Sequence, residues 1–340
     1  MACGAARGVS TGWCRPFEML SLAGPITTDE RPPMRKDLQI SSAVAPALLV
    51  VGGSGRLGRL LRRAWPLAGA GVRPLWQARD AEAFAGLGGP DLVFDPLAEP
   101  AAFAAAAAAA DAVLMLAAPV TGDAAQLAVT TDLARAALRA AAGRPLFLAS
   151  SAAVYGHPSG LCREEEPPAP VADYGRAKAA MEAAVAGAPG VVVLRIGNVA
   201  GADALLGRRV AGVRPLHVFE DGRAPRRSYI GPQALVRALA RLVRLAAAGA
   251  DLPGVINLAL PGAVGMEALL EADGQSWAPL PAPAGLIPRV EFELRRACLL
   301  GLVPEEEATA RRIVADLRAL ETVPAEASQN TVGAGEGRTA

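Results

Sequence analysis

A tyrosine and a lysine four residues apart, Tyr174 and Lys178, stand in the helix-forming stretch ADYGRAKAAME at residues 172–182. Side chains at this spacing are neighbours on one face of a helix. A free tyrosine ionises near pH 10, so using it as a base at neutral pH costs about 4 kcal/mol. A lysine cation within about 5 Å lowers that cost. The spacing therefore predicts an acid–base tyrosine; the alternative is a tyrosine at the edge of the core beside a solvated lysine.

Two serines precede this pair, in the segment LASSAAVYG that follows an apolar run at 144–151. Ser151 lies 23 residues before Tyr174, and a serine hydroxyl can hold a substrate oxygen beside such a tyrosine. The three residues Ser151, Tyr174 and Lys178 together suit hydride transfer to or from a carbonyl carbon, with Tyr174 transferring the proton.

A glycine-rich turn is the expected source of the hydride carrier's binding site. The segment VVGGSGRLG places Gly52, Gly55 and Gly58 at GxxGxxG spacing, after an apolar run and at the start of a helical pattern. A pyrophosphate must approach such a backbone closely, and the helix N-terminus offers free N–H groups. A tight strand–helix turn is the alternative. The residues predicted to contact the cofactor here are Gly52, Gly53, Ser54, Gly55, Arg56, Leu57 and Gly58.

The end of the second predicted strand indicates which cofactor binds. An acid there would hold the ribose hydroxyls of NAD, whereas a basic residue would pair with the 2′-phosphate of NADP. Arg79 lies about 20 residues past the glycines, and no acid precedes Asp80. We therefore expect NADP rather than NAD, unless Arg79 is a surface charge or Asp80 is the ribose partner. Asp95, after the third strand, is placed to meet the adenine or to serve as an ordinary turn aspartate.

Apolar runs alternate with helical patterns along the chain and must position these residues. Strands are predicted at 45–51, 72–80, 91–96, 111–119, 144–151, 190–198 and 254–260, and helices after the glycines and at 101–110, 124–143, 173–187, 229–249 and 305–321. Strands that are apolar throughout, separated by helices, indicate an α/β fold with a doubly wound parallel sheet of the Rossmann type. Ligands then bind beyond the carboxyl ends of the strands.

Four regions are expected. Residues 1–43 read as a disordered extension, with Met1 or Met34 as the start; residues 44–198 form the NAD(P)-binding domain, with elements from about 225–260 packed on it. Residues 199–322 form a small C-terminal substrate-binding region, and 323–340 a flexible tail.

Composition narrows the function classes. The net charge is +1 and no dense basic block occurs, so nucleic acid is not an expected partner. Asp111 interrupts the longest apolar run, which argues against a membrane span. Four scattered cysteines and two histidines argue against a metal site and for a reducing cytoplasm. The expected partner is a small-molecule substrate.

The ordered set GxxGxxG, SSAAVYG, YxxxK and LRIGNVAG resembles the extended short-chain dehydrogenase/reductases, specifically the NAD-dependent epimerase/dehydratase family, over about residues 46–260. The resemblance implies that Ser151 is the catalytic serine and Tyr174 the acid–base. It implies that Lys178 is the partner of Tyr174 and also binds the nicotinamide ribose. Ala117 would lie beside the cofactor and Asn198 would face the substrate. A homodimer formed through the helices 124–143 and 173–187 is a further expectation from the family.

Three departures from the family pattern matter. Ala152 and Ala153 stand where family dehydratases carry an Asp-Glu pair, which argues strongly against dehydration. The helix after the fourth strand lacks the family's asparagine, for which Thr130 or Thr131 is the nearest substitute. The usual HVDD before the late helix reads YIGPQ at 229–233.

The segment between Asn198 and Arg227 is short for a full nucleotide-sugar cradle. Arg226 and Arg227 are candidates to bind a phosphate or carboxylate on the substrate, and a solvated pair is the equal alternative. The first reading is an NADP(H)-linked reductase of a modest carbonyl or sugar-type substrate. The second is a sugar or nucleotide-sugar epimerase with tightly bound NAD. The third is a non-catalytic NAD(P)-sensing protein, against which the intact Ser151–Tyr174–Lys178 set argues.

Overall fold

A seven-stranded parallel sheet forms the centre of the fold in this computed structural model, which describes residues 45–84 and 88–322. The strand order is β12-β7-β5-β4-β1-β2-β3, and every neighbouring pair is parallel. This order runs outward from β1 in both directions, which confirms the doubly wound prediction. The strands are β1 (Ala47–Val51), β2 (Arg73–Ala78), β3 (Leu92–Val93), β4 (Ala112–Met115), β5 (Leu146–Ser151), β7 (Val191–Ile196) and β12 (Val255–Leu258).

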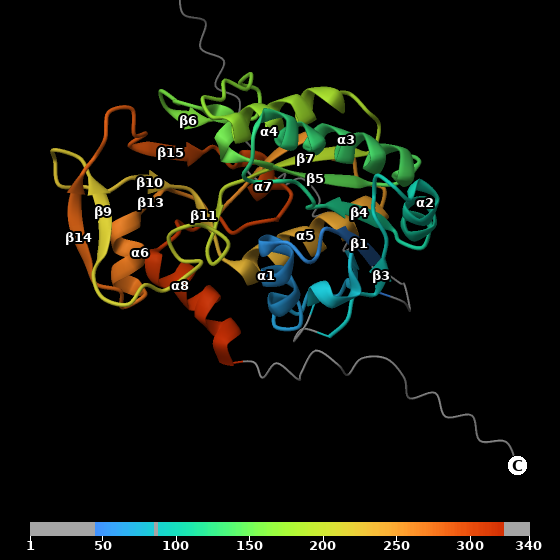
Figure 1. Cartoon of the computed structure of the whole chain (residues 1–340), viewed down its shortest axis with the longest axis horizontal. Coiled ribbons are helices and arrows are strands. Elements are labelled where there is room, and N and C mark those ends of the chain that lie inside the picture. Colours follow the sequence, from blue (N-terminus) through green and yellow to red (C-terminus); the bar gives the residue numbers. More distant parts are fainter. Residues whose placement is uncertain (1–44, 85–87, 323–340) are drawn as a thin grey trace, which may run out of the picture. The chain divides into compact units, whose positions relative to one another are not determined.

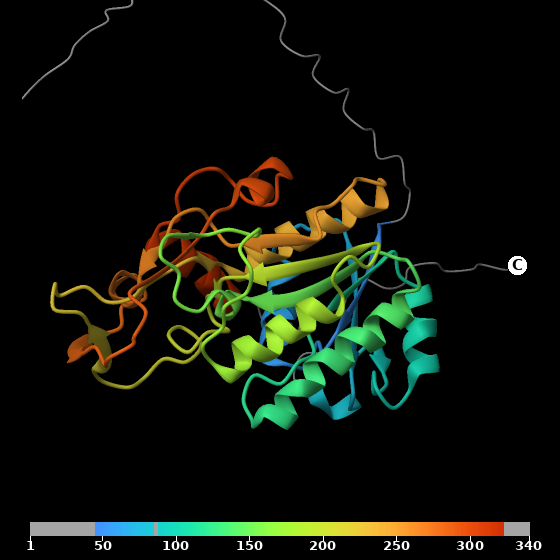
Figure 2. The same cartoon turned by 90° about the horizontal axis from the view of Figure 1, so that it is seen from above.

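Helices cover both faces of this sheet (Figures 1 and 2). Helices α2 (Pro100–Ala108), α3 (Ala124–Ala141) and α4 (Asp173–Ala184) pack against one another, and α1 (Arg56–Ala64) packs against α5 (Pro232–Ala247). Alternate residues of β1 therefore enter two separate cores: Leu48 enters the core with α5 and Leu49 the core with α3. Burial on both faces explains why the strands are apolar throughout.

Smaller elements, most of them C-terminal, extend the carboxyl end of the sheet (Figure 1). Three small sheets form, with the orders β13-β10-β15-β6, β11-β8 and β14-β9. Their strands are β6 (Leu161–Cys162), β8 (Asn198–Val199), β9 (Arg214–Val218), β10 (Arg226–Arg227), β11 (Tyr229–Ile230), β13 (Val264–Gly265), β14 (Trp277–Pro281) and β15 (Arg289–Phe292). The helices are α6 (Met266–Ala272), α7 (Arg295–Leu299) and α8 (Ala310–Arg318), and the single 3₁₀ turns are η1 (Ala81–Phe84), η2 (Ala152–Tyr155) and η3 (Ala319–Thr322).

Most predicted strands and helices form, but several boundaries differ. The third strand keeps two residues of the predicted 91–96, and the fourth ends at Met115 rather than at 119. The late helix begins at Pro232 rather than at 229, because proline suits the first helical turn and Tyr229–Ile230 pairs as β11. The predicted extension 1–43 and tail 323–340 lie outside the described residues. Within the described part of the chain, no helix has the length and apolar character needed to cross a membrane.

The N-terminus of α5 receives its cap from the distant helix α8. The carboxylate of Asp316 accepts hydrogen bonds from the backbone N–H groups of Gln233, at 2.8 Å, and Ala234, at 3.0 Å. Gly231 permits this approach, since a Cβ there would lie 2.4 Å from the same carboxylate. Asp316 thus satisfies the helix end for which the local YIGPQ segment supplies no acidic residue.

We expect Asp316→Ala to lower the free energy of unfolding by about 1–2 kcal/mol, because two helix N–H groups lose their acceptor. Urea denaturation followed by circular dichroism measures this. Asp316→Asn retains one acceptor oxygen and should lose less. Equal stability of Asp316→Ala and the parent would show that the cap contributes nothing.

Candidate active site

In the turn between β1 and α1, a side chain would have a different steric effect at each of the three spaced glycines. Gly52 has a φ of +88°, and a Cβ there would lie 2.6 Å from the backbone of Ala117. A Cβ on Gly58 would lie 2.5 Å from the backbone of Gly53. A Cβ on Gly55 would meet only one atom, at 3.4 Å, and would instead enter the cavities that Gly55 lines. The turn thus leaves bare backbone at a helix N-terminus, which fits a dinucleotide pyrophosphate.

Gln77 supports this turn and was not predicted from the sequence. Its side-chain oxygen accepts a hydrogen bond from the Gly52 N–H at 2.9 Å, and its amide donates to the Phe94 carbonyl at 2.5 Å. Gln77 is 1% exposed, so its amide links the glycine turn to the end of β3 inside the core. The sequence indicated this role only through Gln77 itself, the one amide side chain in β2, whose last three residues are buried.

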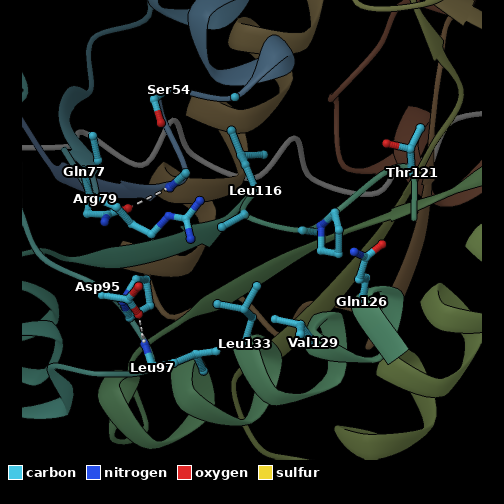
Figure 3. Close-up of a pocket in the computed structure, with 17 residues that line it drawn as sticks. Ser54, Gln77, Arg79, Asp95, Leu97, Leu116, Thr121, Gln126, Val129 and Leu133 are labelled. Carbon is cyan, nitrogen blue, oxygen red and sulfur yellow. Dashed lines mark hydrogen bonds between the residues drawn. The ribbon is translucent and has the colours of Figure 1, made fainter. Parts of the chain in front are cut away.

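A cavity of about 670 Å³ lies beyond the ends of β1, β2 and β4. Figure 3 shows the Arg79 side chain extending into it from the end of β2, on the side where Asp95 lies. The Asp95 carboxylate accepts hydrogen bonds from the N–H groups of Leu97 and Ala98, which lower its pKa. Asp80 is not among the lining residues; its carboxylate accepts from the Glu82 N–H at 2.8 Å.

A second cavity, of about 780 Å³, continues from the first. The two share lining residues at the glycine turn and after β4: Gly52, Gly55, Leu116, Ala118, Pro119 and Thr121. Ser151 at the end of β5, Tyr174 and Lys178 on α4, and Asn198 on β8 all line the second cavity. One cleft therefore joins the glycine turn to the predicted Ser–Tyr–Lys set.

Most of the other residues predicted to contact the cofactor line one of the two cavities. Ser54 and Ala117 line the first cavity, whereas Arg56, Leu57 and Gly58 line the second. Gly53 lines neither; its N–H donates to the Gln77 carbonyl.

Arg227 is also absent from the lining of both cavities. It lies on β10, half-buried, and donates hydrogen bonds to the carbonyls of Arg226 and Ile287, at 2.8 and 2.7 Å. Arg226 is half-buried as well and donates to the Ala263 carbonyl. The alternative of a solvated pair is therefore wrong.

The electrostatics of Tyr174 and Lys178 differ from the sequence expectation. The Lys178 ammonium donates to the Ala149 carbonyl at 2.7 Å and lies 5.9 Å from the centre of the Tyr174 ring. Burial lowers the pKa of Lys178 to about 8, with Glu182 acting in the opposite direction. Burial also raises the pKa of Tyr174, opposed by a hydrogen bond with Ser151. Burial and the hydrogen bond with Ser151 thus act on the pKa of Tyr174 in opposite directions, and burial is the larger of the two causes.

We expect Lys178→Met to raise the free energy of unfolding at pH 7 by about 1–3 kcal/mol, because a buried ammonium is replaced by an apolar side chain. An unfolded lysine titrates near 10.4, so the unfolded chain binds more protons between pH 8 and 10.4. Parent stability therefore rises with pH across that window, and the burial cost is complete below pH 8.

Urea denaturation at pH 7 and pH 10 checks this prediction. The gain of Lys178→Met over the parent should shrink at the higher pH. Arg176→Met, on the exposed side of the same helix, is the matched control and should show no such pH-dependent gain. Lower stability of Lys178→Met at pH 7 would contradict the assignment of a destabilising buried charge.

Sequence reasoning missed three ionisable groups around this cavity. Asp203 lines it and accepts a hydrogen bond from the Tyr229 hydroxyl at 2.8 Å, and burial raises the pKa of Asp203. Glu182 and Arg195 form an ion pair behind it. The signal for that pair was an arginine in the apolar strand VVVLRI and an acid one helical turn after Lys178.

The two cysteines in the described part of the chain form no disulfide. Cys162 is buried and Cys298 half-buried; both are free, and burial raises the pKa of the Cys162 thiol to about 11. Across residues 45–84 and 88–322, no three His, Cys, Asp or Glu side chains gather as metal ligands would.

Several solved structures share this fold. UDP-glucose 4-epimerase from Brucella ovis, in complex with NAD, is 24% identical with a TM-score of 0.64, over 79% of this chain and 96% of that one. A short-chain dehydrogenase/reductase superfamily protein from Agrobacterium tumefaciens, with bound NAD, is 22% identical with a TM-score of 0.61, over 81% and 97%. ADP-L-glycero-D-manno-heptose-6-epimerase from Helicobacter pylori is 18% identical with a TM-score of 0.62, over 82% and 97%.

No curated protein sequence matches the chain significantly. The sequence model of the NAD dependent epimerase/dehydratase family matches residues 48–259, which hold the glycine turn, the Ser–Tyr–Lys set and most of the sheet. The chain belongs to the NAD-dependent epimerase/dehydratase family, with the Rossmann fold of the extended short-chain dehydrogenase/reductases.

Proposed function

We propose that this protein is an NAD(P)-dependent oxidoreductase that moves a hydride to or from a carbonyl or carbinol carbon of a small or sugar-type substrate. The observation that carries the proposal is the single cleft in which Ser151, Tyr174 and Lys178 face the glycine turn. A binding module would need the glycine turn alone. A hydroxyl donor, a tyrosine and a buried lysine beside it are the groups that a proton transfer requires.

The chain's own residues have defined tasks in this proposal. Ser151 holds the substrate oxygen by its hydroxyl, beside the hydroxyl of Tyr174. Tyr174 donates its phenolic proton to that oxygen in the reductive direction and recovers a proton in the oxidative direction. Lys178 contributes positive charge beneath the ring, 5.9 Å from its centre, and is held there by the Ala149 carbonyl. When bound, the nicotinamide cofactor would supply or accept the hydride, and its oxidised form would add a positive charge near Tyr174.

We also propose that the cofactor is NADP rather than NAD. The support is that Arg79 lines the cavity at the end of β2, whereas the carboxylate of Asp80 is engaged by the Glu82 N–H. A guanidinium at this place can hold the 2′-phosphate by paired charged hydrogen bonds. Asn198 lines the cleft and is proposed to face the substrate; Arg227 would reach a substrate only by giving up its bonds to two carbonyls.

We expect Arg79→Ala to weaken NADPH binding at least tenfold, about 1.4 kcal/mol, while leaving NADH binding within about twofold. Removing the guanidinium deletes a partner for the 2′-phosphate, which NADH lacks. Calorimetric titration of both nucleotides measures the change. Arg73→Ala is the matched control, an exposed arginine at the start of β2 that lines neither cavity. An equal loss for both nucleotides in Arg79→Ala would contradict a 2′-phosphate contact.

The test that separates the functional readings is the identity of any nucleotide that the purified protein releases on denaturation. A protein that binds added NADPH at least tenfold more tightly than NADH would support an exchangeable cofactor and a reductase. Stoichiometric NAD⁺ released only on denaturation would favour an epimerase that recycles its cofactor. The epimerase hypothesis has its own support, because UDP-glucose 4-epimerase from Brucella ovis and ADP-L-glycero-D-manno-heptose-6-epimerase from Helicobacter pylori share this fold.

A further inference from the structure

A buried ion pair lies directly behind the proposed catalytic residues. The Arg195 and Glu182 side chains are only 4% and 8% exposed. The guanidinium donates to one carboxylate oxygen through Nη2 at 2.8 Å and through Nε at 3.1 Å. Removing two charges from water is costly, and a buried pair often contributes no net stability compared with apolar side chains of similar size. Stability is therefore a weak explanation for this pair.

Glu182 connects the pair to the catalytic face of α4. It lies four residues after Lys178 and eight after Tyr174, so the three side chains follow one helix face. Its second carboxylate oxygen accepts a hydrogen bond from the Ser150 hydroxyl. Ser150 lines the same cavity as Ser151, its neighbour in the chain. One carboxylate thus touches the strand end that carries the catalytic serine and stands one turn from the lysine.

Arg195 is held in place from the opposite side. It lies opposite Ser150 in the register of β5 and β7. Its Nη1 donates to the Tyr155 hydroxyl at 3.0 Å, and that hydroxyl donates to the Asn257 side-chain oxygen at 2.7 Å. The guanidinium also stacks on the Tyr155 ring, 4.8 Å from its centre. These contacts fix the guanidinium, which in turn fixes the carboxylate of Glu182.

We propose that Glu182 is a positioning residue for the reaction: its charge, oriented by Arg195, keeps the Lys178 ammonium protonated in a dry site and holds the Ser150–Ser151 strand end in place. This proposal rests on the function proposed above. Its physical basis is that a buried ammonium needs an opposite charge nearby to stay charged. Burial alone would bring the pKa of Lys178 lower than about 8, and Glu182 is the charge that opposes it.

Several other ionisable groups lie on the elements around Lys178 and Glu182, among them the buried Glu164, whose carbonyl accepts a hydrogen bond from Arg195. On α4 these include Tyr174; from β7 comes Arg195, and from η2 Tyr155. Asp203 lines the same cavity, and burial raises its pKa.

The titration of Lys178 can be measured directly, because the chain has only two lysines, Lys36 and Lys178. Full-length protein carrying ¹³C at the lysine ε-carbon gives two NMR resonances to follow with pH, and Lys36→Arg assigns them. In Glu182→Gln we expect the Lys178 midpoint to fall by about one pH unit. Asp173→Asn removes an exposed carboxylate from the same helix and should leave the midpoint unchanged.

A double variant, Glu182→Gln with Arg195→Met, separates charge from structure. It removes both charges of the ion pair with side chains of similar size, so neither member of the pair stays buried without the other. If the Lys178 midpoint still lies below that of the parent, the carboxylate charge acts on Lys178 and the proposal holds. If the midpoint returns to the parental value, the shift in Glu182→Gln came from the unpaired arginine, and the proposal is overturned. An unchanged midpoint in Glu182→Gln also overturns it.

This measurement needs no substrate, so its result is independent of the proposed reaction. The Lys178 midpoint can fall in Glu182→Gln and in the double variant while Tyr174→Phe leaves turnover unchanged. That result would support the electrostatic coupling and refute the oxidoreductase assignment. If Tyr174→Phe loses turnover but Glu182→Gln leaves the Lys178 midpoint unchanged, the oxidoreductase assignment is supported and the coupling is refuted.

Discussion

Tyr174→Phe should reduce turnover by about 10²–10⁴-fold, because the variant removes the proton donor and keeps the ring that packs beside Lys178. Binding of NADPH should stay within about twofold of the parent, since the glycine turn and Arg79 are untouched. Turnover is followed by nicotinamide absorbance, using a panel of aldehydes, ketones and sugars to find a substrate for the parent protein. Cofactor binding is measured separately by titration.

The matched control is Arg176→Gln, on the exposed side of the same helix. It should keep parental turnover. Equal turnover of Tyr174→Phe and the parent would refute the acid–base role. A third outcome would favour a non-catalytic NAD(P) sensor. In that case the parent binds NADPH but turns over no compound, and Tyr174→Phe changes neither property.

Arg195→Met should lower the free energy of unfolding by about 3–5 kcal/mol, because it leaves the Glu182 carboxylate buried without its partner. The Tyr155 hydroxyl loses a donor at the same time. Urea denaturation monitored by circular dichroism measures the loss. Part of the deficit should be recovered when Glu182→Gln is added, because the carboxylate that lost its Arg195 partner is then removed as well.

The contrast with an exposed pair makes this result specific. Arg176 pairs with Asp173 on the same helix, with side chains 55% and 60% exposed, so Arg176→Met should cost less than about 1 kcal/mol. A loss for Arg195→Met as small as that for Arg176→Met would show that water or a proton readily compensates Glu182. The pair would then not be desolvated in solution.

Local patterns were enough to predict most of the sheet and many of the residues that line the candidate cleft. Apolar runs of strand length alternate with helical patterns, and burial on both faces leaves such runs few other structures. The GxxGxxG turn could be predicted because its steric requirements involve residues close in sequence. A Cβ on Gly58, for example, would collide with the Gly53 backbone in the same turn. Tyr174 and Lys178 could be predicted as a pair for a similar reason, since one helical turn places them side by side.

Contacts between distant segments were decided only by the tertiary structure. The partner of Glu182 is Arg195 because α4 packs over β5 and β7, and the strand register sets Arg195 opposite Ser150. Asp316 caps α5 from 83 residues away, a contact no local pattern at 229–233 could show. The ionisation of Lys178 also belongs to this class. Its type and spacing predicted a cation beside Tyr174, but how readily it stays charged depends on burial and on the carboxylate that the fold brings beside it.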